Sequence, residues 1–366
     1  VFSGGERGNH GTQCQRQERV GRAIYVVDMQ TGTLLRRFVS YIDEGGTERR
    51  FKAPITGSPA LYNSFPGSLV TRGFVGDAAG RMFRIDMSHS DPLDWQVELF
   101  FDPVEAEDND EIDAQPPYGP ASFKPALALG TEATDRNLLV FYGLGEPGDT
   151  TTGGQTQVVF ALEEQLQSDT NNKFAESELV WEAELGLDTG QTVREKLTGE
   201  PVVFNNAVYF TSYAIEGGDL CVPGHSRIWG LEFEGEIDSS TGEPTGNIAG
   251  VWDENSGFSG ASVSFGPGPS DAHHWFSPTQ ATLIRGLTVT LGPSCSTGVD
   301  STSGGFEESD QRQPTLIAQT GQTPDGEINK STGTDSTGST SLSRIEKKLQ
   351  PPESENIPLS WKVIRN

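Results

Sequence analysis

Four short segments that share one pattern decide the fold of this chain: Tyr25-Val26-Val27-Asp28, Phe83-Arg84-Ile85-Asp86, Phe160-Ala161-Leu162-Glu163 and Trp229-Gly230-Leu231-Glu232. Each segment consists of an aromatic residue, any residue, an aliphatic residue and an acid. The segments follow one another at intervals of several tens of residues. Self-similarity at such a period is typical of stacked supersecondary units, and strand-like units of this kind form propeller blades or solenoids.

Apolar runs on both sides of each segment predict further strands. The strand before each repeat is expected at 70–76, 138–143 and 207–212, and an earlier one at 59–61, 124–129 and 200–204. The strand after each repeat is expected at 34–39, 96–101, 179–185 and 250–252. Four short strands per unit make one antiparallel propeller blade, so the predicted fold class is an all-β, antiparallel β-propeller. Only 163–167 and 342–349 have a briefly helical pattern.

A fifth, eroded unit is expected near the C-terminus, with strands in 278–292, at Thr315–Ala318 and at Leu359–Ile364. The segments 294–310 and 320–343 are rich in Ser, Thr, Gly and Asp, and are therefore predicted to be long surface loops. The first unit begins mid-way at Val1, which suggests strands upstream of this sequence. We accordingly interpret residues 1–366 as a single propeller domain, or as its C-terminal blades.

Composition limits the possible partners. The chain has 366 residues, a formal net charge of −26, 34% hydrophobic residues, 44 Gly and 22 Pro. The glycine and proline content suits short strands joined by turns and long loops. The negative charge repels phosphate backbones, so nucleic acid is not expected as a partner. No apolar stretch approaches the ~18 residues of a membrane span.

The acid that ends each repeat is predicted to be architectural. Asp28, Asp86, Glu163 and Glu232 end strands and precede turns, where a carboxylate accepts N–H bonds. A role repeated in every unit is structural rather than catalytic. We therefore expect the four acids at equivalent positions of successive blades.

Other candidate site residues are few. Asp108, Asp110 and Asp113 lie in the densest acidic run and could bind calcium, although a solvated acidic loop is the simpler interpretation. His273 and His274 are adjacent, and in an extended segment they would point to opposite faces. No nucleophile elbow and no phosphate-binding GxxxxGK[ST] loop occurs.

The three cysteines, Cys14, Cys221 and Cys295, exclude a disulfide-dense scaffold and have no zinc-site spacing. A Cys221–Cys295 bridge is the favoured pairing because both lie in predicted turns of neighbouring C-terminal units, but Cys14 could pair with either. An exported compartment would let such a bridge persist.

The repeats resemble the blades of quinoprotein-dehydrogenase-like propellers, through the aromatic-x-aliphatic-Asp strand followed by Thr31-Gly32. More narrowly, the stretch 74–87 (FVGDAAGRMFRIDM) is similar to a signature of the PilY family of type IV pilus biogenesis factors and tip adhesins. Further stretches at 1–5, 138–145 and 199–231 match that family in the same order, and Trp361 fits its terminal strand.

This resemblance implies a non-catalytic, exported module at the pilus tip or outer surface of a Gram-negative bacterium. Its expected partners are minor pilins and abiotic or cell surfaces, and its expected roles are pilus biogenesis, adhesion and twitching motility. The family's Asp-x-Asp-x-Asp calcium loop is not matched, because Leu61–Ser68 contains no carboxylate. We therefore assign no cofactor, and we do not expect calcium to bind at Leu61–Ser68. The calcium-switched pilus retraction that the resemblance would otherwise imply does not follow.

The alternative is a pyrroloquinoline quinone-dependent dehydrogenase-like enzyme, since those enzymes resemble this chain in blade pattern. They typically use adjacent cysteines beneath the quinone and a calcium ion ligated by Glu, Asn and Asp. No two cysteines of this chain are adjacent. The interaction module is therefore the favoured prediction, and no catalytic residue is assigned.

Overall fold

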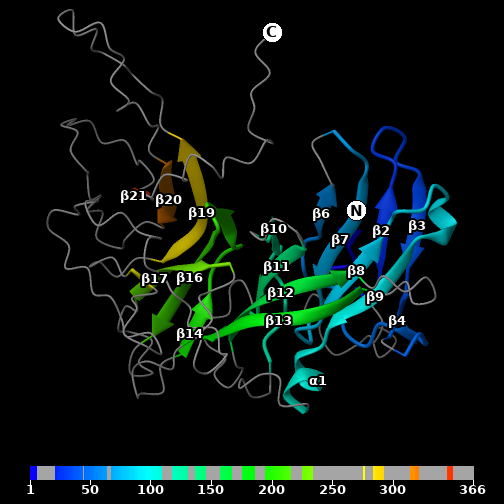
Figure 1. Ribbon diagram of the computed structural model, residues 1–366, viewed down its shortest axis with the longest axis horizontal. Coiled ribbons are helices and arrows are strands. Elements are labelled where there is room, and N and C mark those ends of the chain that lie inside the picture. Colours follow the sequence, from blue (N-terminus) through cyan, green and yellow to red (C-terminus); the bar gives the residue numbers. More distant parts are fainter. Residues whose placement is uncertain are drawn as a thin grey trace, which may run out of the picture.

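A computed structural model describes the chain in fourteen segments. They are 1–5, 21–43, 45–63, 67–108, 118–130, 137–145, 157–166, 175–185, 194–215, 225–233, 275–276, 283–291, 314–320 and 344–348. Within these segments the protein is almost entirely β-structure in several antiparallel sheets. The all-β prediction is confirmed. The sheets follow one another in chain order across the molecule, from β1–β3 at one end to β19–β21 at the other (Figure 1).

The described residues form five sheets, whose strands pair antiparallel except for one parallel pairing in the second sheet. The first has β1 (Phe2–Ser3), β2 (Ile24–Val27) and β3 (Leu34–Phe38). The second has β6 (Ala60–Asn63), β7 (Val70–Gly76), β8 (Met82–Asp86) and β9 (Gln96–Phe101), and is extended beyond β9 by β4 (Ser40–Ile42) and β5 (Glu48–Arg50). The third has β10 (Ala126–Leu129), β11 (Leu138–Gly143), β12 (Val158–Leu166) and β13 (Ala175–Glu184).

The fourth and fifth sheets complete the series. The fourth has β14 (Arg194–Leu197), β15 (Val202–Phe204), β16 (Ala207–Ile215), β17 (His225–Glu232) and β18 (Trp275–Phe276), with β14 and β15 both paired to β16. The fifth has β19 (Ile284–Leu291), β20 (Pro314–Thr320) and β21 (Arg344–Lys348). A 3₁₀ turn, η1 (Pro92–Asp94), and one helix, α1 (Pro103–Asp108), are the helical elements among the described residues.

The four repeat segments occupy the same place in their sheets. They lie on or at the end of β2, β8, β12 and β17, and each of these strands pairs with the strand before it and the strand after it. The aromatic and the aliphatic residue of each repeat lie two places apart, so both side chains point to the same face of their sheet.

Consecutive sheets also touch through their first strands. β6 contacts β10, β10 contacts β15, and β15 contacts β19. Three apolar cores fill the spaces between sheets: one between the first and second sheets around Ile24 and Phe83, one between the second and third around Phe74 and Phe160, and one joining the last three sheets around Phe141 and Phe210.

Close backbone contacts hold successive sheets at short range. The peptide N–H of Ala121, in the segment leading to β10, donates to the carbonyl of Asp77 at the end of β7, at 2.9 Å. The Gly5 N–H donates in the same way to the Ile55 carbonyl at 3.1 Å, joining the first sheet to the second. A Cβ on Gly76 would lie 2.4 Å from the Cβ and the carbonyl oxygen of Ala121. Only glycine fits there, because the two sheets meet backbone to backbone.

Several local expectations were wrong. Both segments with a helical pattern are strands, because residues 163–166 belong to β12 and 344–348 to β21. The outer strand of the fourth sheet is β18, while the expected strand at 250–252 lies outside the described residues, as does the one at 359–364. Pairing in a sheet overrides a short periodic pattern, because a strand satisfies its backbone only through its neighbours.

Candidate functional site

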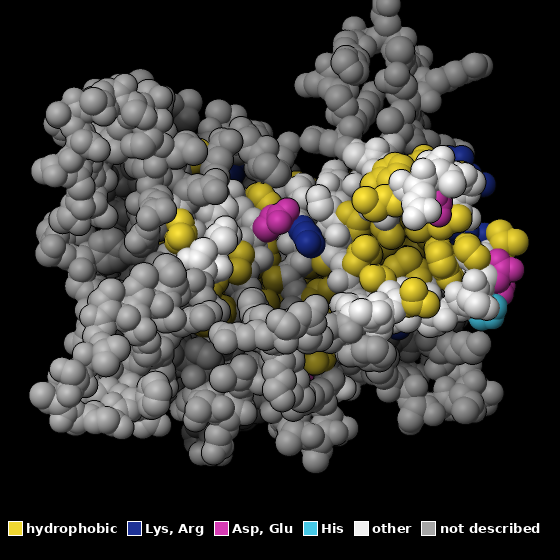
Figure 2. Space-filling model, turned by 90° about the horizontal axis from the view of Figure 1, so that it is seen from above, with side chains coloured by type: hydrophobic (Ala, Val, Ile, Leu, Met, Phe, Trp, Pro, Cys, Tyr) yellow, Lys and Arg dark blue, Asp and Glu magenta, His cyan; other side chains and the backbone are white. Residues whose placement is uncertain are grey.

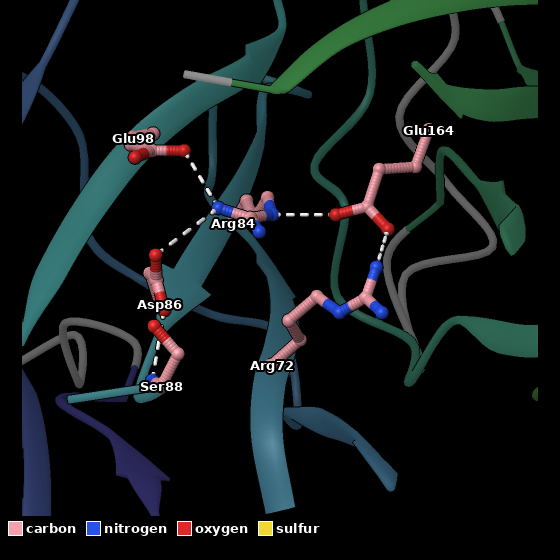
Figure 3. A network of polar contacts seen from close by, with 6 residues as sticks. All are labelled: Arg72, Arg84, Asp86, Ser88, Glu98 and Glu164. Atoms are coloured by element: carbon pink, nitrogen blue, oxygen red, sulfur yellow. Dashed lines mark hydrogen bonds and ion pairs between the residues drawn. The ribbon is translucent and has the colours of Figure 1, made fainter. Parts of the chain in front are cut away.

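Among the described residues, a cluster of buried charges lies between the second and third sheets (Figure 3). Arg84 on β8 donates through Nε to Glu164 on β12 at 2.6 Å and through Nη1 to Glu98 on β9 at 2.9 Å. Arg72 on β7 also pairs with Glu164. Asp86 lies 3.8 Å from Arg84 and accepts the Ser88 N–H at 2.8 Å. We call Arg72, Arg84, Asp86, Glu98 and Glu164 the ion cluster.

The ion cluster is sealed from solvent at its centre. Glu164 is fully buried, and Arg84 and Glu98 are 5% and 3% exposed. Burial alone would lower the pKa of Arg84, but attraction to Glu164 and Glu98 outweighs it, so this pKa lies above its ordinary value. The guanidinium therefore stays charged and keeps both carboxylates as partners. Such a cluster fixes how two sheets meet, because an ion pair of fixed geometry tolerates only one alignment.

A second buried polar set crosses the fourth sheet. Arg227 on β17 donates to Glu195 on β14 at 2.8 Å, and Ser212 on β16 donates to the other oxygen of Glu195. The Trp229 indole N–H donates to the Ser212 hydroxyl at 2.8 Å. These contacts tie the outer strand β14 to the repeat strand of the same sheet.

A third charged pair closes the hairpin between β7 and β8. Asp77 accepts the Ala79 and Arg81 N–H groups at 2.9 and 3.1 Å, and the Arg81 side chain at 3.0 Å from Nε and 2.6 Å from Nη2. Burial raises the pKa of Asp77, while Arg81 and the two N–H groups oppose that rise. The Tyr142 hydroxyl donates to the Gly80 carbonyl at 3.2 Å, and burial raises the pKa of this tyrosine well above its ordinary value.

A hollow of about 460 Å³ opens where the first strands converge. Ser58, Ser122, Phe123, Gly199, Glu200, Pro201, Val202, Gly286 and Leu287 line it. These residues come from the segments that lead into β6, β10 and β15, and from β19. The polar side chains among these lining residues are two hydroxyls and one exposed carboxylate, so the hollow can accept a polar or cationic group.

Asp28 and Asp86 accept turn N–H groups, as predicted, whereas Glu163 lies inside β12 and neither ends its strand nor precedes a turn. Asp28 accepts the Gln30 and Thr31 N–H groups at 3.0 and 2.7 Å and the Thr31 hydroxyl at 2.8 Å. These bonds lower the pKa of Asp28, and the bond from the Thr31 hydroxyl has the largest effect. Glu163 accepts from the side chains of Asn137 and Gln165.

The remaining predicted site residues lie outside the part of the chain that the structure describes. The side chain of Asp108, at the end of α1, and residues Asp110 and Asp113 are not described, nor are Cys14, Cys221, Cys295, His273 and His274. Of the segment Leu61–Ser68, residues 64–66 are not described. Within the described part of the chain, no group of three His, Cys, Asp or Glu side chains is placed to hold a metal.

Sequence reasoning missed the ion cluster. Its signal was visible: Arg84 interrupts an aromatic-x-aliphatic strand, and Glu164 extends a strand that is otherwise apolar from Val158 to Leu162. A charge on a strand buried on both faces requires a partner, but the strand alone does not say which sheet supplies it.

Comparisons of the chain with protein-family models, with curated proteins and with solved structures find no match. Among the described residues, no helix is long and apolar enough to cross a membrane.

Proposed function

We propose that this chain is a non-catalytic β-propeller that supports type IV pilus assembly, surface adhesion and twitching motility at the pilus tip. The observation that carries the proposal is the ordered set of family-like motifs, from the opening glycine turn to the stretch 74–87 and the later repeats. The succession of antiparallel sheets along the chain supports it, because a short antiparallel sheet is the building unit of a propeller.

The distribution of charge supports an interaction role. The buried charged groups described above pair with one another, so they serve the scaffold and leave recognition to the surface. Loops on a rigid scaffold usually carry binding residues. Minor pilins and abiotic or cell surfaces are the proposed partners, outside the cell envelope.

The test is deletion of the gene in the source organism, followed by complementation. We expect loss of surface pili, adhesion and twitching, restored by the wild-type gene. Complementation with a Gly76→Ala variant is expected to lower activity only in proportion to protein level. Normal pilus number, adhesion and twitching in the deletion strain would refute the proposal.

A further inference from the structure

The hollow described above is built from neighbouring sheets. Its wall includes Ser58 before β6, Ser122 before β10, Glu200 before β15 and Gly286 on β19. These residues belong to the second, third, fourth and fifth sheets, and none of the lining residues belongs to the first. A closed ring of blades would keep this space, because the inner strands of a propeller surround a central channel.

A short sequence pattern places one exposed polar side chain at the same point of three sheets. Ser58-Pro59-Ala60, Lys124-Pro125-Ala126 and Glu200-Pro201-Val202 each lead into the first strand of their sheet. Ser58, Lys124 and Glu200 are all exposed. Because β6 contacts β10 and β10 contacts β15, these three positions follow one another from sheet to sheet. The sheets therefore present a hydroxyl, an ammonium group and a carboxylate at equivalent places.

Glu200 gives the hollow its charge. It is the charged side chain among the described residues that line the hollow, and the whole chain carries −26. Both charges favour a cation over an anion at this place. Within the described part of the chain no hydrogen bond or ion pair engages the Glu200 carboxylate, so it is available to a ligand. In the view from above, acidic and basic side chains are exposed near the middle of the molecule, among hydrophobic ones (Figure 2).

The size and the lining of the hollow favour an organic cation over a metal ion. Its volume of about 460 Å³ is that of a pocket for a small molecule. A calcium ion takes roughly 6–8 oxygen ligands, whereas the lining side chains offer one carboxylate and two hydroxyls. Phe123, Pro201, Val202 and Leu287 add apolar surface to the wall. This combination suits a ligand with a charged head and an alkyl part.

We propose that the hollow binds the ammonium group of an alkylamine. Glu200 is its counter-ion, the hydroxyls of Ser58 and Ser122 accept hydrogen bonds from it, and the alkyl part packs on Phe123 and Leu287. A free alkylamine and the lysine side chain of a protein partner present the same chemistry, and the test distinguishes these two sources. This inference does not rest on the proposed pilus function.

Ligand-observed NMR titration of the purified chain with n-butylammonium chloride tests the proposal. We expect a Kd on the order of 1 mM, because a ligand of so few atoms gains little binding energy. Glu200→Gln should raise this Kd about three- to tenfold, since the amide keeps the shape of the side chain but loses its charge. The Glu200 side chain is exposed, so the variant should keep the wild-type melting temperature. Added salt should weaken the binding, because it screens the attraction between the charges.

Lys124→Gln is the matched control, because Lys124 occupies the equivalent position of the neighbouring sheet and carries the opposite charge. This variant should bind n-butylammonium at least as tightly as the wild type, since it removes a positive charge near the site. Two results would overturn the proposal. One is a wild-type protein that does not bind n-butylammonium, and the other is a loss of affinity in Lys124→Gln as large as that in Glu200→Gln.

A second ligand, Nα-acetyl-lysine methylamide, identifies the source of the ammonium group, because it presents a lysine side chain without a free α-amine. If the wild type binds it and Glu200→Gln weakens that binding, the hollow takes the lysine side chain of a protein partner. If the wild type binds n-butylammonium alone, the hollow takes a free alkylamine. Both results support an ammonium site at Glu200.

Discussion

Replacing Glu164 by Gln tests whether the ion cluster fixes the packing of the second sheet on the third. Glu164 is fully buried and receives Arg84 at 2.6 Å as well as Arg72. Removing one partner of a buried ion pair costs roughly 3–5 kcal/mol. The amide oxygen of Gln still accepts a hydrogen bond, and Arg72 is 18% exposed and can turn to water. We therefore expect Glu164→Gln to lower the free energy of unfolding by roughly 2–4 kcal/mol.

Urea unfolding followed by fluorescence and by far-ultraviolet circular dichroism measures this loss. The matched control is Glu163→Gln on the same strand. Its partly exposed carboxylate accepts from the side-chain amides of Asn137 and Gln165, and its replacement should cost less than about 1 kcal/mol. A double-mutant cycle with Arg84→Met should give a coupling energy of about 0.5–3 kcal/mol. If Glu164→Gln costs no more than Glu163→Gln, the cluster does not hold the sheets together.

Two further predictions concern a close contact and a turn. Gly76→Ala should lower the free energy of unfolding by about 1–3 kcal/mol, because the new methyl group would meet Ala121. The control Gly45→Ala, on an exposed turn, should change the free energy of unfolding by less than about 0.5 kcal/mol. Equal effects of the two variants in thermal melts would contradict the packing argument. The pKa of Asp28 is lowered by its turn bonds, the first being that from the Thr31 hydroxyl, so its contribution to stability is present above pH 3.8 and is lost as pH falls through the folded-state value. Asp28→Asn should therefore reduce the loss of unfolding free energy as the pH falls into the acid range. An unchanged acid-induced loss would show that the bonds accepted by Asp28 do not contribute to stability.

The sequence alone predicted much of the fold, because the information is local. A short continuous apolar run specifies a strand covered on both faces, as in Val158–Leu162. The turn chemistry after Asp28 was also predictable, since a carboxylate, a threonine and a glycine at close spacing satisfy a turn by themselves.

The helical expectation at 163–167 failed for a physical reason. Glu163, Glu164 and Gln165 favour helix by intrinsic propensity, but β11 and β13 provide backbone partners on both sides of this segment. A strand between two others gains every ladder bond, and this gain exceeds the small propensity difference per residue.

What the sequence by itself determined is therefore the series of antiparallel units and the place of the repeat strand within each. Only the tertiary structure decided that Glu164 reaches Arg84, which lies 80 residues away and in another sheet. Only the tertiary structure decided that Met29 is exposed where Met87 is buried. A strand pattern states that a side chain will be covered, but the covering surface comes from a distant segment whose position depends on how whole sheets pack.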